Sequence, residues 1–425
     1  MMKRLLFTAV LAVALLGLNG TIDLNELFNY DDQFVPNYVN RDNTPPGNAI
    51  SDAGATLGRV LFYDVNLSAN NTVACAHCHK QEFAFGDTRV RSEGLNGGLT
   101  GRHSMRLVNA RFSNETRFFW DERAVSLEDQ TTHPIKDHVE MGFSGTDGDP
   151  AIDSLILKLS AIPYYQELFT FVYGSPEITE LKMQLALAQF IRSIQSFDAK
   201  YDEGRAQVPN DNAPFPNFTP QENQGKTLFL APPANGGAGC AGCHQPPTFD
   251  IGPNTLNNGV IGVAGDPTAT DLTNTRAPSL RDLLNPAGVP NGPFMHDGSL
   301  PNLMAVINHY DDIDFDPAIN PDLDPRLRGG PGGQGQNLGL TQAQKDALVA
   351  FLATLSGTNI YTDPRWSNPF APDGELDIIP YCGAPIESVV EAIICAGDEM
   401  DGYSETGIYT DTFTASNGCD SIRQL

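Results

Sequence analysis

Two copies of the pattern Cys-x-x-Cys-His constrain this chain more than any other feature of its sequence. The first copy is Cys75-Ala-His-Cys78-His79 and the second is Cys240-Ala-Gly-Cys243-His244. In this pattern two thiols add across the two vinyl groups of a haem, and the adjoining histidine reaches the iron. The sequence therefore predicts two covalently attached c-type haems. The predicted attachment residues are Cys75, Cys78, Cys240 and Cys243, and the predicted iron ligands are His79 and His244.

Two other interpretations of these motifs stay open from the sequence. A zinc site needs four ligands, whereas each motif supplies only two cysteines and one histidine. A thioredoxin-like redox pair belongs in a strand–helix setting, whereas both motifs lie in loop-like sequence. Two copies in one chain with an export signal favour haem over either interpretation.

The first twenty residues are typical of a secretory signal. Lys3 and Arg4 precede the apolar run 5–18, and Gly20 offers a small residue for cleavage. The apolar run is too short to span a bilayer comfortably, and no later run reaches that length. We therefore expect an exported protein, periplasmic or extracellular, that does not span the membrane. A buried N-terminal helix is the alternative.

The composition limits the partners and the amount of regular structure. Lys and Arg number 26 against 52 Asp and Glu, which gives a net charge of −26. This charge excludes a nucleic-acid-binding protein, and it suits a basic electron donor or simply solubility. With 40 Gly and 31 Pro in 425 residues, we expect long loops around a limited set of helices.

The pattern of motifs and linkers divides the chain into six parts. They are a signal peptide (1–20), an extended lead-in (21–48), an N-terminal haem unit (49–203), a linker (204–220), a C-terminal haem unit (221–360) and a tail (361–425). In the tail, residues 407–413 alternate like a strand, and Cys395 and Cys419 are the expected disulfide, with Cys382 unassigned. We expect a small β-rich extension there, truncated at Leu425, and almost no strand before residue 360.

Each haem unit is expected to close with a helix. The first helix shows apolar residues at alternating spacings of four and three, and Thr179 is its expected N-cap. The second combines a capping box of Thr341 and Gln344 with an apolar stripe, and Gly357 is its expected stop. The apolar positions are Met183, Leu187, Phe190, Ile194 and Phe197 in the first and Leu348, Phe351, Leu352 and Leu355 in the second.

The sequence around the first motif resembles the dihaem bacterial cytochrome c peroxidase family, which includes the tryptophylquinone-forming maturase MauG. The resemblance rests on Arg117-Phe-Phe-Trp120-Asp-Glu-Arg123, on Gln130 and Pro134, and on Glu140-Met141-Gly142. It covers about residues 49–358, with Phe294-Met295-His296-Asp-Gly-Ser after the second motif. It implies a mostly α-helical fold with two cytochrome c-like haem domains and long loops.

The resemblance also implies the roles of individual residues. The first haem would bind peroxide, and the second would pass electrons inward by way of Trp120. Glu140 matches the distal acid–base, which can move a proton between the peroxide oxygens, and Gln130 matches a neighbouring glutamine. A solvated surface Glu and a core-packing Trp are the plain alternatives. The implied reaction reduces hydrogen peroxide to water with electrons from a monohaem cytochrome c or a cupredoxin.

Three positions depart from the common peroxidase pattern. Leu95 stands where many members carry a second His ligand of the first iron, so that iron is expected to be five-coordinate. Tyr310 stands where the usual Met ligand of the second iron lies, and Met295 is the alternative ligand; Tyr310 also shares an apolar helical face with Leu303. His103 stands where a calcium-binding Asn is common, and neutral His is a poor calcium ligand. A calcium ion and a homodimer therefore stay open.

Three functions are compatible with this sequence. The leading interpretation is a dihaem peroxidase. Tyr310 and Leu95 favour a second interpretation, a MauG-like oxidase that acts on a partner protein. A non-catalytic dihaem electron carrier is the third. The tail also resembles C-terminal modules of secreted bacterial surface proteins, which would place the enzyme outside the outer membrane.

Overall fold

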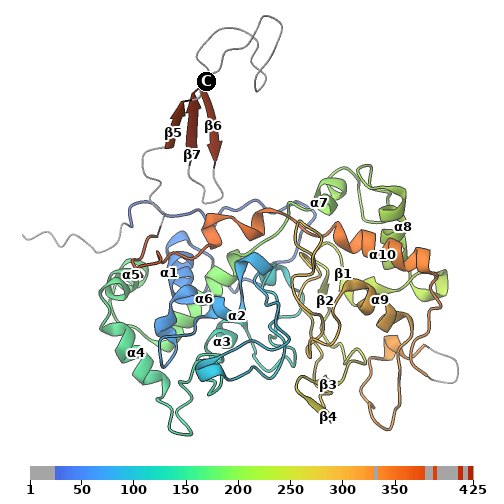
Figure 1. Cartoon of the computed structure of the whole chain (residues 1–425), viewed down its shortest axis with the longest axis horizontal. Helices are drawn as coiled ribbons and strands as arrows, with labels where there is room; N and C mark the ends of the chain where they lie inside the picture. The colour runs from blue at the N-terminus through green and yellow to red at the C-terminus, as the bar shows by residue number, and fades with distance from the viewer. Residues whose placement is uncertain (1–23, 330–333, 379–385, 390–409, 415–419, 425) are drawn as a thin grey trace, which may run out of the picture.

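The computed structural model describes residues 24–329 and 334–378, with three short strands further on at 386–389, 410–414 and 420–424. The signal segment 1–20 and the cysteines Cys382, Cys395 and Cys419 lie outside the described residues, so the signal and the disulfide remain predictions. Helices dominate the described structure and form two groups side by side (Figure 1). None of the described helices is long and apolar enough to cross a membrane.

The first group of helices surrounds one large hydrophobic core. It consists of α1 (Asp52–Tyr63), α2 (Cys75–Cys78), α3 (Leu127–Thr132), α4 (Ile152–Ser160), α5 (Pro163–Tyr173) and α6 (Glu180–Ser193). The predicted cap of α6 is confirmed, because the Thr179 hydroxyl accepts the amide of Lys182 at 3.2 Å. Helix α1 crosses α6 at Gly58, where any Cβ would collide with the Ala186 carbonyl. The missing side chain lets the two helices approach closely.

The second group repeats this crossing with different residues. It contains α7 (Lys200–Arg205), α8 (Pro220–Leu230), α9 (Leu303–Asp311) and α10 (Gln342–Ala353). Helix α8 crosses α10 at Gly225, where a Cβ would collide with the Ala347 carbonyl. The predicted capping box of α10 is confirmed, since Gln344 Oε1 accepts the Thr341 amide at 2.9 Å and the Thr341 hydroxyl accepts the Gln344 amide at 3.4 Å. The predicted stop at Gly357 is wrong, because α10 already ends at Ala353.

Strands are short and few, as predicted for the part before residue 360. Antiparallel pairs join β1 (His244–Gln245) to β2 (Asp250–Ile251) and β3 (Gly262–Val263) to β4 (Asp266–Thr270). Near the C-terminus, β5 (Ile386–Val389), β6 (Thr410–Thr414) and β7 (Asp420–Gln424) form a sheet in the order β5-β7-β6, with β5 parallel and β6 antiparallel to β7. Strand β6 overlaps the predicted strand 407–413, of which 407–409 lie outside the described residues.

Segments without regular structure complete both cores. Tyr30 of the lead-in is fully buried, and its hydroxyl donates to the Arg365 carbonyl at 2.6 Å. Trp366 and Ile378, beyond the second haem unit, also belong to the first core. Phe215, within the segment expected to be a linker, is buried in the second core. The chain therefore crosses between the two groups of helices several times.

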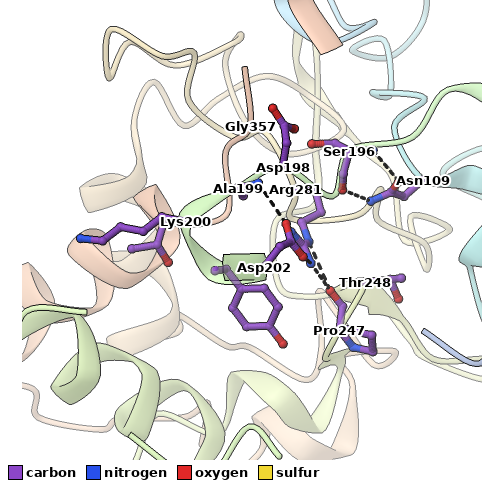
Figure 2. Close-up of polar contacts among 12 residues, drawn as sticks. Asn109, Ser196, Asp198, Ala199, Lys200, Asp202, Pro247, Thr248, Arg281 and Gly357 are labelled. Carbon is purple, nitrogen blue, oxygen red and sulfur yellow. Dashed lines mark hydrogen bonds and ion pairs between the residues drawn. The ribbon is translucent and has the colours of Figure 1, made fainter. Parts of the chain in front are cut away.

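A buried ion pair ties α7 to the loops of the second group (Figure 2). Arg281 is 0% exposed, and its guanidinium donates to both carboxylate oxygens of Asp202, at 2.7 and 2.9 Å. It also donates to the Pro247 carbonyl at 2.7 Å. Asp202 in turn accepts the Ala199 amide at 3.0 Å and the Tyr38 hydroxyl at 2.8 Å. Both members of the ion pair therefore make at least one further hydrogen bond.

Replacing Asp202 by Asn should lower the free energy of unfolding by about 3 kcal/mol, because the Arg281 charge then stays buried without a counter-charge. Urea unfolding of the holoprotein measures this value. Glu93→Gln is the matched control: its partner Arg89 is 57% exposed and Glu93 is 52% exposed, so the change should stay within about 0.5 kcal/mol. Equal losses for the two variants would contradict a structural role of the Asp202 carboxylate.

Candidate active site

Each Cys-x-x-Cys-His motif opens onto its own cavity. The first cavity measures about 480 Å³, and its walls include Cys78, His79, Gln130 and Glu140. The second measures about 640 Å³, and its walls include Cys240, Cys243 and His244 together with Met295 and Tyr310. The structure therefore brings each motif together with residues that lie far away in the sequence.

The first motif is held so that the ring of His79 has one free nitrogen. Helix α2 carries Cys75 and Cys78, and His79 follows at its C-cap. The Nδ1 atom of His79 lies 3.2 Å from the Phe85 carbonyl, which can only accept. Nδ1 therefore carries the proton and Nε2 is left as a lone-pair donor. Burial also lowers the pKa of His79, which favours the neutral imidazole that a metal requires.

Glu140 and Gln130 lie on the wall of the same cavity. Gln130 belongs to α3, whose N-cap Ser126 accepts the Asp129 amide at 3.1 Å. Glu140 belongs to a turn that Asp137 holds, since its Oδ1 accepts the amides of Val139 and Glu140 at 2.8 and 3.0 Å. Burial raises the pKa of Glu140 to about 7; the Asp137 charge adds to this effect, and the Arg123 charge opposes it. A carboxyl group poised near neutrality can both accept and return a proton.

Trp120 belongs to the walls of both cavities. Its indole nitrogen donates to the His103 carbonyl at 2.7 Å. Its own carbonyl accepts the amides of Thr275 and Arg276 at 2.8 and 3.0 Å. The indole ring also makes an edge contact with the His296 ring, with 6.3 Å between ring centres. These contacts fix the indole between the two cavities from both sides.

The second motif shares the chemistry of the first. His244 lines its cavity, and burial lowers its pKa to about 4, so its ring is neutral at physiological pH.

Burial raises the pKa of both Cys75 and Cys240 to about 12, so these thiols are protonated. A redox-active Cys-x-x-Cys pair needs a lowered thiol pKa. The raised values count against the thioredoxin-like interpretation.

The two candidate ligands of the second iron, Tyr310 and Met295, accept hydrogen bonds from the same side-chain amide. Tyr310 stands on α9, and Met295 stands on the loop before it with a φ of 72°. Asn258 Nδ2 donates to the Met295 sulfur at 3.2 Å and to the Tyr310 hydroxyl at 3.1 Å. Burial holds the pKa of Tyr310 above its usual value, so the phenol stays protonated until a cation lies beside it. No local pattern in the sequence points to Asn258, because its two partners lie 37 and 52 residues away.

The two cavities fit haem better than a smaller metal site. Each is large and mostly apolar in its lining, and each is lined by the motif histidine and by motif cysteines, Cys78 in the first and Cys240 and Cys243 in the second. Within the described ranges, no group of three or more His, Cys, Asp or Glu side chains is placed to hold a metal ion, which counts against zinc. At the position where the family often has a calcium-binding Asn, His103 Nδ1 bonds to the Arg89 carbonyl at 2.9 Å. The calcium ion stays a prediction.

The remaining predicted positions lie away from the two cavities. Leu95 packs against Gly142 in the turn after Glu140 and is not part of the cavity lining. Four other histidines hydrogen-bond to protein groups and line neither cavity. His77 accepts the Ala74 amide, His133 and His138 pair with Asp129 and Asp149, and His309 bonds to the Asn258 carbonyl.

Comparison with known proteins agrees with this geometry. Residues 52–208 match the family described as di-haem cytochrome c peroxidase. The methylamine utilization protein MauG of Methylorubrum extorquens is 31% identical over 320 residues, which cover 73% of this chain and 80% of that protein. The cytochrome c551 peroxidase of Nitrosomonas europaea is 25% identical over 338 residues, which cover 76% of this chain and 84% of that protein.

Solved structures extend the agreement to the fold. A MauG-like protein associated with microbial copper homeostasis superposes with a TM-score of 0.63 at 28% identity, covering 80% of this chain and 99% of that one. The diheme peroxidase BthA of Burkholderia thailandensis shares the fold with a TM-score of 0.54 at 21% identity, covering 77% of this chain and 91% of that one. The chain belongs to the di-haem cytochrome c peroxidase family, which implies two c-type haems and includes proteins named MauG as well as peroxidases.

Proposed function

We propose that this protein is a dihaem peroxidase that reduces hydrogen peroxide to water with two electrons from a small donor protein. The observation that carries the proposal is that Glu140 and His79 line the same cavity, while Trp120 lines both cavities. A haem bound at His79 would supply the iron at which the O–O bond is cleaved. The overall reaction consumes one peroxide, two electrons and two protons and yields two waters.

The chain's own residues manage protons and orientation. As a carboxylate, Glu140 accepts the proton of the peroxide oxygen nearer to His79 and returns it to the oxygen that leaves as water. Gln130 offers an amide donor on the same wall, so it can orient the peroxide. Trp120 is fixed between the cavities by its bond to His103, and it provides the aromatic route for electrons from the second haem to the first.

A second function has support from one observation. Tyr310, not Met, stands on α9 beside the second cavity, and the 31% identical relative is named MauG. A MauG-like oxidase would draw electrons from a partner protein rather than from a small donor. Peroxide added to the ferric protein without any donor discriminates the two. A slowly decaying optical change favours the oxidase, and rapid donor-dependent peroxide consumption favours the peroxidase.

The haem assignment predicts a stepwise loss of haem. Replacing Cys240 and Cys243 together by Ser should reduce the covalently bound haem from two per chain to one, because the thioether bonds at that cavity cannot form. The pyridine haemochrome assay and the mass of the intact protein measure this ratio. The matching Cys75 and Cys78 double variant is the reciprocal control. A protein that carries no covalent haem before any substitution would refute the assignment.

Replacing Glu140 by Gln should slow peroxide consumption at least about 100-fold, because Gln cannot accept the proton. The parent activity should fall as the pH drops through about 7, since Glu140 becomes protonated there, and the variant should lose this limb of the profile. Steady-state turnover across the pH range measures both effects. The exposed Glu82→Gln is the control and should keep the parent profile. Parent-like turnover in Glu140→Gln would remove this residue from the mechanism.

Replacing Tyr310 by Phe should change the optical and EPR signals of one haem and leave those of the other unchanged. The reason is that only the second cavity contains Tyr310. Met295→Leu is the matched test of the alternative ligand on the same Asn258 amide. Altered signals in Met295→Leu alone would assign the ligand to Met295 instead.

A further inference from the structure

Among the described residues, Arg106 lines both cavities and forms no ion pair. Its stem runs beside Gly86, where a Cβ would lie 2.9 Å from Arg106 Cγ. Its guanidinium makes a single hydrogen bond, a long one of 3.4 Å to the Ser279 carbonyl. The Nε atom is buried and has no hydrogen-bond partner. Most of the five donors of this group therefore lack an acceptor.

Three other buried arginines in the described structure have more hydrogen-bond acceptors than Arg106. Arg281 pairs with both oxygens of Asp202, and Arg192 pairs with Glu128 at 2.5 Å. Arg276 also lines both cavities, and it donates to the Glu115 and Arg117 carbonyls and to the Ser113 hydroxyl. A buried cation without acceptors is strongly destabilising, so it normally has an anionic partner.

Both cavities end at Arg106. It belongs to the lining of the first cavity and of the second, together with Trp120 and Arg276. Burial lowers its pKa to about 10, and the charge of Asp282 offsets this only in part. Asp282 forms no ion pair or hydrogen bond with Arg106 in the described structure. The missing acceptors must therefore come from whatever fills the cavities.

We propose that Arg106 binds propionate carboxylates of the haems where the two cavities meet. Haem carries two propionates at one edge, and guanidinium groups bind carboxylates through paired hydrogen bonds. The bond would fix the propionate edge beside Trp120 and would supply a positive charge near the iron. The proposal rests on haem occupancy of the cavities and is independent of peroxidase activity.

The test compares haem midpoint potentials in three variants. In Arg106→Gln the potential of at least one haem should fall, because the lost cation had favoured the reduced form. At about 10 Å and an effective dielectric of about 20, the oxidised-to-reduced ratio should change about tenfold at fixed potential. Arg106→Lys keeps the charge and should shift less. Arg89→Gln, at a side chain that is 57% exposed, should match the parent. Unchanged potentials in Arg106→Gln would overturn the proposal.

A second measurement covers the case in which Arg106→Gln does not load haem. A crystal structure of the parent holoprotein should show a propionate oxygen within hydrogen-bond distance of the Arg106 guanidinium. The propionate bending bands in the resonance Raman spectrum should shift in Arg106→Lys. A guanidinium that contacts only protein carbonyls, with unshifted bands, would overturn the proposal whatever the outcome of the Glu140 test.

Discussion

The wall between the two cavities is the constraint on which the rest of the site depends. Trp120 is bound on one side through its indole nitrogen to His103 and on the other through its carbonyl to Thr275 and Arg276. These bonds join the loop after the first motif to the loop after the second. A displacement of either loop would therefore move the indole and change the shape of both cavities. In the proposed mechanism, electron transfer between the haems and the shape of the peroxide site would both depend on these bonds.

The two groups of helices meet the same packing problem in the same way. In each, a glycine on the helix before the Cys-x-x-Cys-His motif allows close contact with the last helix, Gly58 with Ala186 and Gly225 with Ala347. The close crossing places the motif that follows this helix beside the core. This repeat is hard to see from the sequence, because a helix crossing depends on partners more than one hundred residues apart. The tail of the chain then packs against the first core, with Arg59 donating to the Ser367 and Ile378 carbonyls.

Local signals in the sequence predicted local structure well. Thr179, Thr341 and Gln344 act as caps because a capping contact spans only three residues. Gly357 failed as a stop because α10 had already ended. The Gly357 amide instead donates to Asp282, 75 residues away. Phe215 lies in Pro-rich sequence typical of a linker, yet it is buried in the second core, since burial is decided by distant neighbours.

In the candidate site, too, contiguous motifs were predictable from the sequence, whereas residues that act through distant partners were not. The haem motifs are contiguous and were predicted from their spacing alone. Glu140, Gln130 and Trp120 came from the resemblance to the family, and the structure places all three on the first cavity. Asn258 and Arg106 carry no motif, and only the folded chain shows that one holds both candidate ligands and the other lacks acceptors.

Burial raises the pKa of an ionisable group in each of the two cavities. In the first cavity it raises the pKa of Glu140 to about 7, which leaves a group able to exchange a proton at neutral pH. In the second cavity it keeps the Tyr310 phenol protonated, so the oxygen becomes a strong ligand only if iron displaces the proton. Asn258 donates to this oxygen, and such a bond favours the anion over the phenol. The same amide also contacts the Met295 sulfur, a much weaker acceptor. The Asn258 contact therefore favours Tyr310 over Met295, and an anionic ligand at this iron would stabilise its oxidised form.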